Sequence, residues 1–159
     1  MEKKYCDQLI EQATTDSGLA WRIMDEPHKK HHKVDISFSA EYGPAKKYIW
    51  FIDLVKKDVK NLNPNFEMSE WCTLMVYTEG SFFKPHTDAS SYDAYLSAGY
   101  NLNKGFKGGD YIIKGHTIYP DIGELFTFGR DDMHEVTEIT KGTRFSVHFA
   151  IKNTQKSLF

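Results

Sequence analysis

The hydrophobic periodicity of this 159-residue chain changes once, near residue 70. Before that point the apolar residues favour helices, a short one over about 5–13 and a longer one within 43–64. In the longer segment Pro44 suits a first helical turn, and Asn63-Pro64 ends the pattern. Its apolar stripe, at helical spacing, is Tyr48, Phe51, Ile52, Val55 and Val59. Between the two helices, the segment KVDISFS alternates as a half-buried strand does.

After residue 70 the period is two, and turn residues divide the chain into eight short segments. These predicted strands are 71–78, 83–88, 95–102, 110–114, 116–119, 123–128, 133–138 and 143–151. Many short strands with regular turns predict a β-sandwich or barrel, with the earlier helices packed outside one sheet. We therefore expect a mainly β fold with N-terminal helices. The length suits a single domain over 1–159, with 1–69 as a helical and strand support region and 70–151 as the β core.

The last predicted strand, TRFSVHFAI, has one apolar and one polar face, because side chains alternate along a strand. Its polar face carries Arg144, Ser146 and His148. The first predicted strand, WCTLMVYT, divides in the same way and places Tyr77 on the less apolar face. Two strands with an apolar outside and a polar inside indicate a sandwich with a polar cavity. The alternative is that the polar face is simply solvated, which is common in antiparallel sheets.

His86 and Asp88 stand two residues apart, so on an extended chain both side chains point the same way. An imidazole nitrogen and a carboxylate oxygen that converge on one point suit a divalent cation such as Fe(II). One further histidine would complete a face of two histidines and one carboxylate, and would leave positions open for an organic ligand and dioxygen. Alone, however, a His-x-Asp triplet arises often by chance.

Six histidines are candidates for the third ligand: His28, His31, His32, His116, His134 and His148. The best placed is His134, because it follows a Gly-Arg-Asp-Asp loop and begins a predicted strand. His31-His32 lies among lysines and is interpreted as a solvated basic loop. His116 precedes a short strand and is interpreted as structural or as a surface residue.

Arg144 follows His134 by ten residues on the polar face of the last strand. Its planar guanidinium can bind a carboxylate through two hydrogen bonds. A buried arginine without an anion is costly, so this position points to an anionic co-substrate. The alternative is an arginine paired with an internal Asp or Glu.

Four segments, in order, carry a family resemblance: Y-x-x-G-x-x-F-x-x-H-x-D at 77–88, LNKGFKGGDY at 102–111, YPDIGELFTF at 119–128 and HEVTEITKGTRFSV at 134–147. Together they resemble the prolyl 4-hydroxylase-type branch of the Fe(II)/2-oxoglutarate dioxygenases. The resemblance spans about 70–151. It implies a double-stranded β-helix, or jelly roll, with helices packed on one sheet. It also implies Fe(II), 2-oxoglutarate and O2 as cofactors and co-substrates, with ascorbate as a further cofactor.

The resemblance implies that His86, Asp88 and His134 are the catalytic iron ligands. Asp88 also bears on the reaction type. In halogenating relatives a Gly or Ala replaces this carboxylate, so its presence favours hydroxylation. The implied reaction hydroxylates an unactivated C–H bond and releases succinate and CO2.

The resemblance assigns 2-oxoglutarate binding to a second set of residues. Arg144 would bind the distal carboxylate, and Ser146, two residues on, would share it. Tyr77 matches a family tyrosine that hydrogen-bonds the same co-substrate. Asn101 departs from the family, which often has Tyr-Leu-Asn where this chain has Asn101-Leu102-Asn103. The shorter side chain could still hydrogen-bond but reaches less far.

Substrate contacts are expected from the segment ASSYDAYLS after the ligand pair and from GRDDM before His134. The candidates are Tyr92, Tyr95 and Arg130, each of which could equally lie in a solvated loop. The resemblance favours a prolyl residue in a peptide or protein, while close relatives act on free amino acids and other small molecules. Two competing classes stay open. One is a non-catalytic metal-binding or structural jelly roll, and the other is a cupin-type metal enzyme that would not need Arg144 or Tyr77.

Charge and cysteine content exclude several classes of binding partner and of small fold. A net charge of −2 gives no footprint for nucleic acid or an anionic membrane. The two cysteines lie far apart in sequence, which argues against a disulfide framework or zinc ribbon. The first residues, MEKKYCDQLIEQ, show no secretory signal, and no apolar run is long enough to span a bilayer. We therefore expect a cytoplasmic protein with a peptide, protein or small-molecule substrate.

Overall fold

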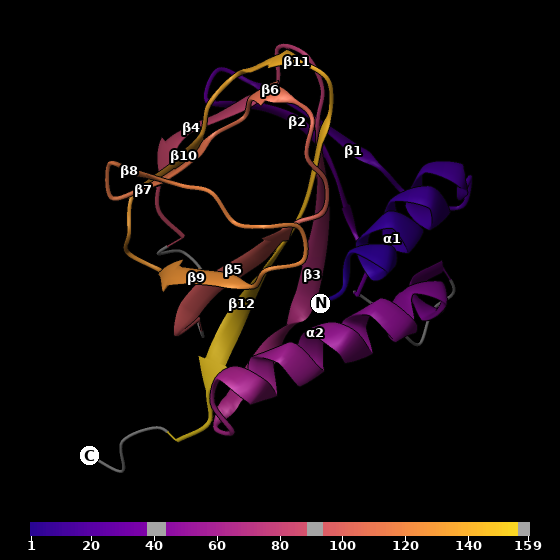
Figure 1. Ribbon diagram of the computed structural model, residues 1–159, viewed down its shortest axis with the longest axis vertical. Coiled ribbons are helices and arrows are strands. Elements are labelled where there is room, and N and C mark those ends of the chain that lie inside the picture. Colours follow the sequence, from indigo (N-terminus) through magenta and orange to yellow (C-terminus); the bar gives the residue numbers. More distant parts are fainter. Residues whose placement is uncertain (38–43, 89–93, 156–159) are drawn as a thin grey trace.

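The computed structural model describes residues 1–37, 44–88 and 94–155 (Figure 1). Two α-helices come from the first half of the chain, α1 (Lys3–Thr15) and α2 (Ile49–Leu62), and a 3-10 turn, η1 (Pro44–Tyr48), leads into α2. The other elements of the described residues are strands: β1 (Arg22–Glu26), β2 (Lys29–Asp35), β3 (Phe66–Tyr77), β4 (Phe82–His86), β5 (Leu96–Asn101), β6 (Lys107–Gly108), β7 (Tyr111–Ile113), β8 (His116–Ile118), β9 (Phe126–Gly129), β10 (His134–Val136), β11 (Ile139–Lys141) and β12 (Arg144–Asn153). Neither described helix is long and apolar enough to cross a membrane.

Antiparallel pairing joins ten strands into one curled sheet in the order β8-β7-β10-β4-β2-β3-β12-β5-β9, with β1 beside β2. A separate pair, β6 and β11, closes one end of the roll (Figure 1). Strand β2 joins the two halves of the sheet. Its residues Lys29 and Lys30 pair with β4, whereas His32 to Asp35 pair with β3. The two halves therefore enclose an interior, as in a jelly roll.

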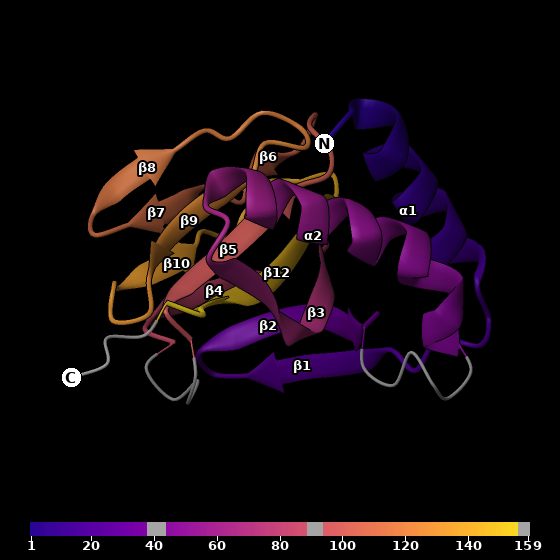
Figure 2. The ribbon, with the colours of Figure 1, turned by 90° about the horizontal axis from the view of Figure 1, so that it is seen from below.

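The helices cover the outer face of β3, β12 and β5, which Figure 2 shows with α2 lying across these strands. Phe51 and Val55 of α2 are fully buried there against a layer that includes Leu74 of β3 and Phe149 of β12. Each such side chain stabilises the fold by roughly 1.5–3 kcal/mol relative to an exposed one. The predicted fold class, mainly β with helices packed on one sheet of a jelly roll, is confirmed.

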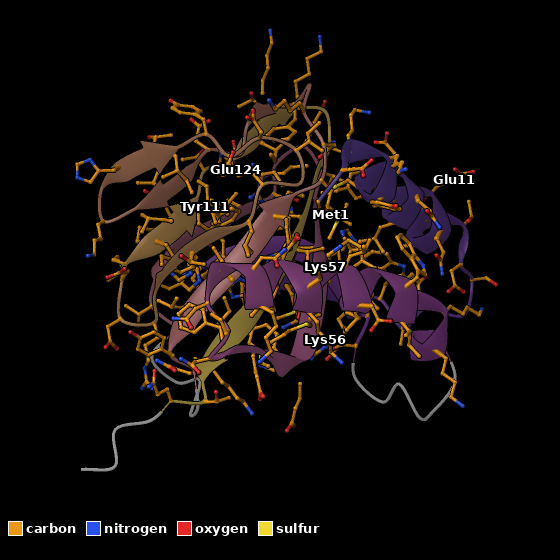
Figure 3. The ribbon with its side chains drawn as sticks, turned by 60° about the horizontal axis from the view of Figure 1, so that its bottom comes forward. Met1, Glu11, Lys56, Lys57, Tyr111 and Glu124 are labelled. Carbon is orange, nitrogen blue, oxygen red and sulfur yellow. The ribbon has the colours of Figure 1, made fainter. Side chains whose placement is uncertain are left out.

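Helix α2 follows the predicted stripe, with Phe51, Ile52, Val55 and Val59 buried. Lys56 and Lys57 lie on its exposed side (Figure 3). The helix ends where Asn63 leaves helical geometry and its backbone N–H donates to the Val59 carbonyl.

All eight predicted strands exist, but β3 begins earlier than expected, at Phe66, and β4 ends at His86 rather than at residue 88. Three strands were not predicted: β1, β6 and β11. The expectation that His31-His32 forms a solvated loop is wrong, because both residues belong to β2. His31 is only 2% exposed, since its ring stacks on both Tyr77 and Phe83. Phe38, expected in the same strand, lies outside the described residues.

Candidate active site

Strand pairing brings the three predicted metal ligands together. His86 ends β4, His134 begins β10, and the two residues are directly paired across these strands. Asp88 follows β4, and its backbone N–H donates to the Arg130 carbonyl at 3.0 Å, which fixes the chain where it leaves the sheet. One ligand atom from each of the three residues lies within 4.8 Å of the others, the one such cluster found across 1–37, 44–88 and 94–155.

Both imidazoles are oriented by backbone carbonyls. Nδ1 of His86 lies 2.7 Å from the Lys84 carbonyl, and Nδ1 of His134 lies 2.9 Å from that of Asp132. A carbonyl can only accept, so each Nδ1 carries a proton, and in the neutral ring Nε2 is the nitrogen with the lone pair. The two Nε2 atoms face Oδ1 of Asp88, at 3.9 Å and 3.4 Å. This is the tautomer that a histidine needs to bind a metal through Nε2.

The rings are held in these orientations by aromatic packing. His86 stacks on Phe83 with ring centroids 3.7 Å apart, and His134 lies 4.5 Å from Phe128. Burial lowers the pKa of His86, which keeps its ring neutral. For His134, burial is the largest single influence and lowers the pKa, but the interactions with Asp88 and Asp132 together outweigh it, so the pKa rises. A divalent cation bound by His134 and Asp88 would replace the proton that the two side chains share.

The two oxygens of Asp88 have different surroundings. Oδ1 faces His86 and His134, whereas Oδ2 accepts a 2.6 Å hydrogen bond from the Ser97 hydroxyl and lies 3.4 Å from Nε2 of His148. Burial alone would raise the pKa of Asp88, but hydrogen bonds from His134, His148 and Ser97 hold it well below its usual range. The carboxylate is therefore anionic and is turned so that Oδ1 is presented to the cluster. Three oriented donors of imidazole and carboxylate type fit a metal such as Fe(II).

Arg144 is a second functional group of the site, apart from the three metal-ligand candidates. It is 1% exposed, and no carboxylate of the described residues lies within ion-pairing distance. Its guanidinium donates to Ser146 Oγ at 3.1 Å and to Asn101 Oδ1 at 3.0 Å, while Nε has no hydrogen-bond partner in the described part of the chain. It also lies over the rings of Tyr77 and Tyr111, at 5.2 Å and 5.6 Å. An internal Asp or Glu partner is thus not found, and a buried guanidinium of this kind calls for an anionic ligand.

A cavity of about 240 Å³ connects the cluster of metal-ligand candidates with Arg144. His86, Asp88 and His134 line it together with Arg144 and Ser146. The polar face predicted for the last strand therefore lines a cavity rather than an open, solvated surface.

Two tyrosines contribute to the same cavity. Burial raises the pKa of Tyr77 to about 12, although Arg144 partly offsets this, so its hydroxyl stays protonated. Burial also raises the pKa of Tyr111. Figure 3 shows Tyr111 on β7 inside the roll. The sequence interpretation missed it, although it is the last residue of the LNKGFKGGDY segment.

The remaining predicted residues lie elsewhere. Asn101 is in the site through Arg144, as described above, but does not line the cavity. The exposed ring of Tyr95 lies 5.8 Å from that of Phe66, outside the cavity lining. Arg130 is half-buried, with Nε 3.9 Å from Asp131, and holds Asp88 through its backbone. Tyr92 lies outside the described residues.

Ser97 was not predicted as a functional residue. Alternation along β5 places it on the same face as Asn101, and this was the available signal. His148 had been a candidate third ligand, and the structure places it on the far side of Asp88 from His86 and His134.

Comparison with known proteins identifies the family. The sequence model of the 2OG-Fe(II) oxygenase superfamily matches residues 72–152, which is half of the chain. The chain belongs to the 2OG-Fe(II) oxygenase superfamily. The match begins in β3 and ends in β12, so it contains both the three metal-ligand candidates and Arg144. No curated protein sequence matches the chain.

Solved structures of this superfamily share the fold at low sequence identity. A prolyl-4-hydroxylase from Pseudomonas putida is 19% identical with a TM-score of 0.70, covering 96% of this chain and 88% of that one. A 2OG-Fe(II) oxygenase family oxidoreductase from Burkholderia pseudomallei is 14% identical with a TM-score of 0.71, covering 92% and 79%. SnoN, a non-heme alpha-ketoglutarate-dependent epimerase from nogalamycin biosynthesis, is 9% identical with a TM-score of 0.71, covering 96% and 75%. A fold that serves both hydroxylation and epimerisation does not fix the substrate.

Proposed function

We propose that this 2OG-Fe(II) oxygenase hydroxylates an unactivated C–H bond, with a prolyl residue in a peptide or protein as the substrate to test first. The observation that carries the proposal is the cavity itself, which joins a cluster of two imidazoles and one carboxylate to a buried arginine that has no carboxylate partner among the described residues. A cupin-type metal enzyme would not need that arginine. The balanced reaction consumes substrate, 2-oxoglutarate and O2 and yields the alcohol, succinate and CO2.

In this proposal the metal is held by three atoms: Nε2 of His86, Oδ1 of Asp88 and Nε2 of His134. Fe(II), when bound, would supply the activation of O2 that oxidises 2-oxoglutarate and delivers one oxygen atom to the substrate. The carbonyls of Lys84 and Asp132 keep both imidazoles in the ligating tautomer.

Arg144 would bind the distal carboxylate of 2-oxoglutarate. The hydrogen bonds to Ser146 and Asn101 hold its guanidinium in place, and the unpartnered Nε leaves a donor available. Tyr77 would donate its hydroxyl to the same carboxylate, since its raised pKa keeps the proton on. Asn101 accepts from Arg144, so we assign it the positioning of that arginine rather than direct contact with the co-substrate.

The same proposal treats residues 1–159 as one catalytic domain, with 1–69 supporting the core at 70–151. It also includes a cytoplasmic location, no nucleic-acid or membrane partner, and ascorbate as a cofactor that sustains turnover.

Anaerobic addition of Fe(II) and 2-oxoglutarate tests the site directly. We expect the weak visible charge-transfer band of a chelated 2-oxoglutarate. In Arg144→Met the dissociation constant of 2-oxoglutarate should rise by about 30-fold or more, because a hydrogen-bonded charge pair in a buried site contributes at least about 2 kcal/mol. The control Lys57→Met removes an exposed cation on α2 (Figure 3) and should leave the band and the dissociation constant of 2-oxoglutarate unchanged. Absence of the band in the wild type, or an unchanged dissociation constant in Arg144→Met, contradicts the proposal.

Asp88→Ala tests the metal assignment, because removal of one metal ligand should abolish substrate hydroxylation. The reaction is followed by succinate release and by the mass shift of a prolyl peptide or free amino acid. Full turnover by the purified variant would refute the metal assignment.

A further inference from the structure

A second cavity, of about 340 Å³, lies beside the metal cluster. Asp88, Met75 and His148 line both this cavity and the one that contains Arg144, so the two adjoin at the metal side of the roll. The walls that belong to the second cavity alone include Arg22, Lys33 and Trp71. A molecule in this space would approach the metal from outside the co-substrate cavity.

Strand register explains how two cations reach this cavity. Arg22 of β1 pairs directly with Lys33 of β2, and Lys33 pairs directly with Met75 of β3. Met75 in turn pairs with Ser146 of β12. Directly paired residues lie on the same face of a sheet, so this row runs across the inner face from the hairpin β1–β2 to the co-substrate cavity.

Neither cation has an ion-pair partner among the residues that the structure describes. In the described parts of the chain no carboxylate lies within 4.0 Å of Arg22 or Lys33. Like charges directly opposite each other on a sheet are destabilising. Consistent with this, burial and then the charge of Arg22 lower the pKa of Lys33. The carboxylate of Glu26 on the same hairpin lies instead against His28 and Lys29, at 3.2 Å and 3.9 Å.

The cavity also contains carboxylates and apolar surface. Asp35 lines it but accepts hydrogen bonds from the backbone and hydroxyl of Ser37. Asp88 would have its charge offset by the metal. The ring of Trp71 lies 5.5 Å from that of His148, so an aromatic wall faces the metal cluster. The arrangement combines two cations with an apolar wall, next to the place where oxidation would occur.

We propose that this cavity binds the substrate through a carboxylate, which Arg22 and Lys33 hold while Trp71 and Met75 contact the carbon skeleton. The inference rests on the proposed function, and it names the substrate class: a molecule or segment with a carboxylate a few bonds from the hydroxylated carbon. The carboxylate can belong to a free acid or to an acidic side chain in a peptide, because both present the same two oxygens to the guanidinium and ammonium groups.

Matched pairs of neutral and anionic probes test this. The protein is loaded with Mn(II) and saturated with 2-oxoglutarate, and binding is measured by calorimetry. Acetyl-proline against acetyl-prolinamide represents the free acid, and acetyl-Pro-Glu-amide against acetyl-Pro-Gln-amide represents the acidic side chain. We expect the carboxylate member of at least one pair to bind at least about tenfold more tightly, the ratio that one charge-assisted hydrogen bond provides.

The double variant Arg22→Gln/Lys33→Gln should lose this preference while its affinity for 2-oxoglutarate is unchanged. The control Lys56→Gln/Lys57→Gln removes the same charge from the exposed side of α2 (Figure 3) and should keep the preference. Equal binding within both pairs, no binding of either carboxylate at millimolar concentration, or a preference that survives in the double variant each overturns the inference.

The measurement also separates this inference from the proposed function. 2-Oxoglutarate binding to the Mn(II)-loaded protein is measured first, without a probe. A protein that does not bind it overturns both proposals. Normal 2-oxoglutarate binding without a carboxylate preference overturns only the assignment of the second cavity.

Discussion

Replacing Ser97 with alanine is expected to weaken metal binding while leaving the fold intact. Ser97 is 1% exposed, and its hydroxyl donates the shortest hydrogen bond in the site, 2.6 Å to Oδ2 of Asp88. Without it, His148, 3.4 Å away, is the remaining contact of Oδ2 within the described residues, and the carboxylate gains freedom to rotate. Oδ1 would then spend less time in the position that faces His86 and His134.

The magnitude follows from the type of bond. A hydrogen bond to a charged group contributes about 1.5–3 kcal/mol, and removal of a group that orients a metal ligand costs about 10- to 100-fold in metal affinity. We therefore expect the dissociation constant of Mn(II) or anaerobic Fe(II) to rise by about 10- to 100-fold in Ser97→Ala. Competition with a fluorescent chelator measures this without a known substrate.

Ser81→Ala is the matched control. Ser81 is also buried, at 3% exposure, but its hydroxyl oxygen accepts from the Thr78 backbone in a turn that does not touch the cluster. This variant should lose about 1 kcal/mol of stability and keep its metal affinity. If Ser97→Ala binds metal within twofold of the wild type, the carboxylate does not need this hydrogen bond and the reasoning fails.

Two further predictions concern stability. Burial lowers the pKa of His31 to about 4, so the unfolded chain takes up a proton more readily than the fold does. The stability from its neutral ring is complete above about pH 6.5 and is lost as pH falls towards 4, at most roughly 3 kcal/mol. Urea unfolding at pH 7 and pH 4.5 should show a larger loss in the wild type than in His31→Phe, because burial also lowers the pKa of His86 in both proteins; equal losses would contradict the prediction. In Gly109→Ala, at φ +65°, the new Cβ would lie 2.2 Å from Ile139 Cδ1, so we expect a loss of about 2 kcal/mol or more. Gly115→Ala, at φ +78° with open space around it, should cost about 1–2 kcal/mol, and an equal cost in both variants would exclude the steric clash as the cause.

The β core could be predicted because its strands alternate strictly. In β12 the alternation alone separates Phe149, packed under the helices, from Arg144 and Ser146, which face the cavity. Only the end of β2 was recognised, in KVDISFS, because the lysines and histidines of its first half hide the inward positions. His31 is buried only through stacking on Tyr77 and Phe83, which a reader of the local sequence cannot see.

In the site too, features set by local spacing could be predicted, whereas features set by strand pairing could not. The spacing of His86 and Asp88 is local, so their common direction was predictable from the sequence. The places of His134 and His148 depend on which strands β10 and β12 pair with, and the sequence offered both as possible ligands. Pairing of His134 with His86 puts it on the Oδ1 side of Asp88, and the position of His148 in β12 puts it on the Oδ2 side.

The double pairing of β2 has a mechanical consequence. Residues up to Lys30 are bonded to β4, which carries His86, and residues from His32 onward are bonded to β3, which lies against the strand that carries Arg144. Any breathing motion that separates the metal half of the roll from the co-substrate half must therefore bend β2 between these two pairings. His31 stands at that point, with one aromatic neighbour in each half. It therefore lies at the junction of the two halves, and its stacking is one of the contacts that hold them together.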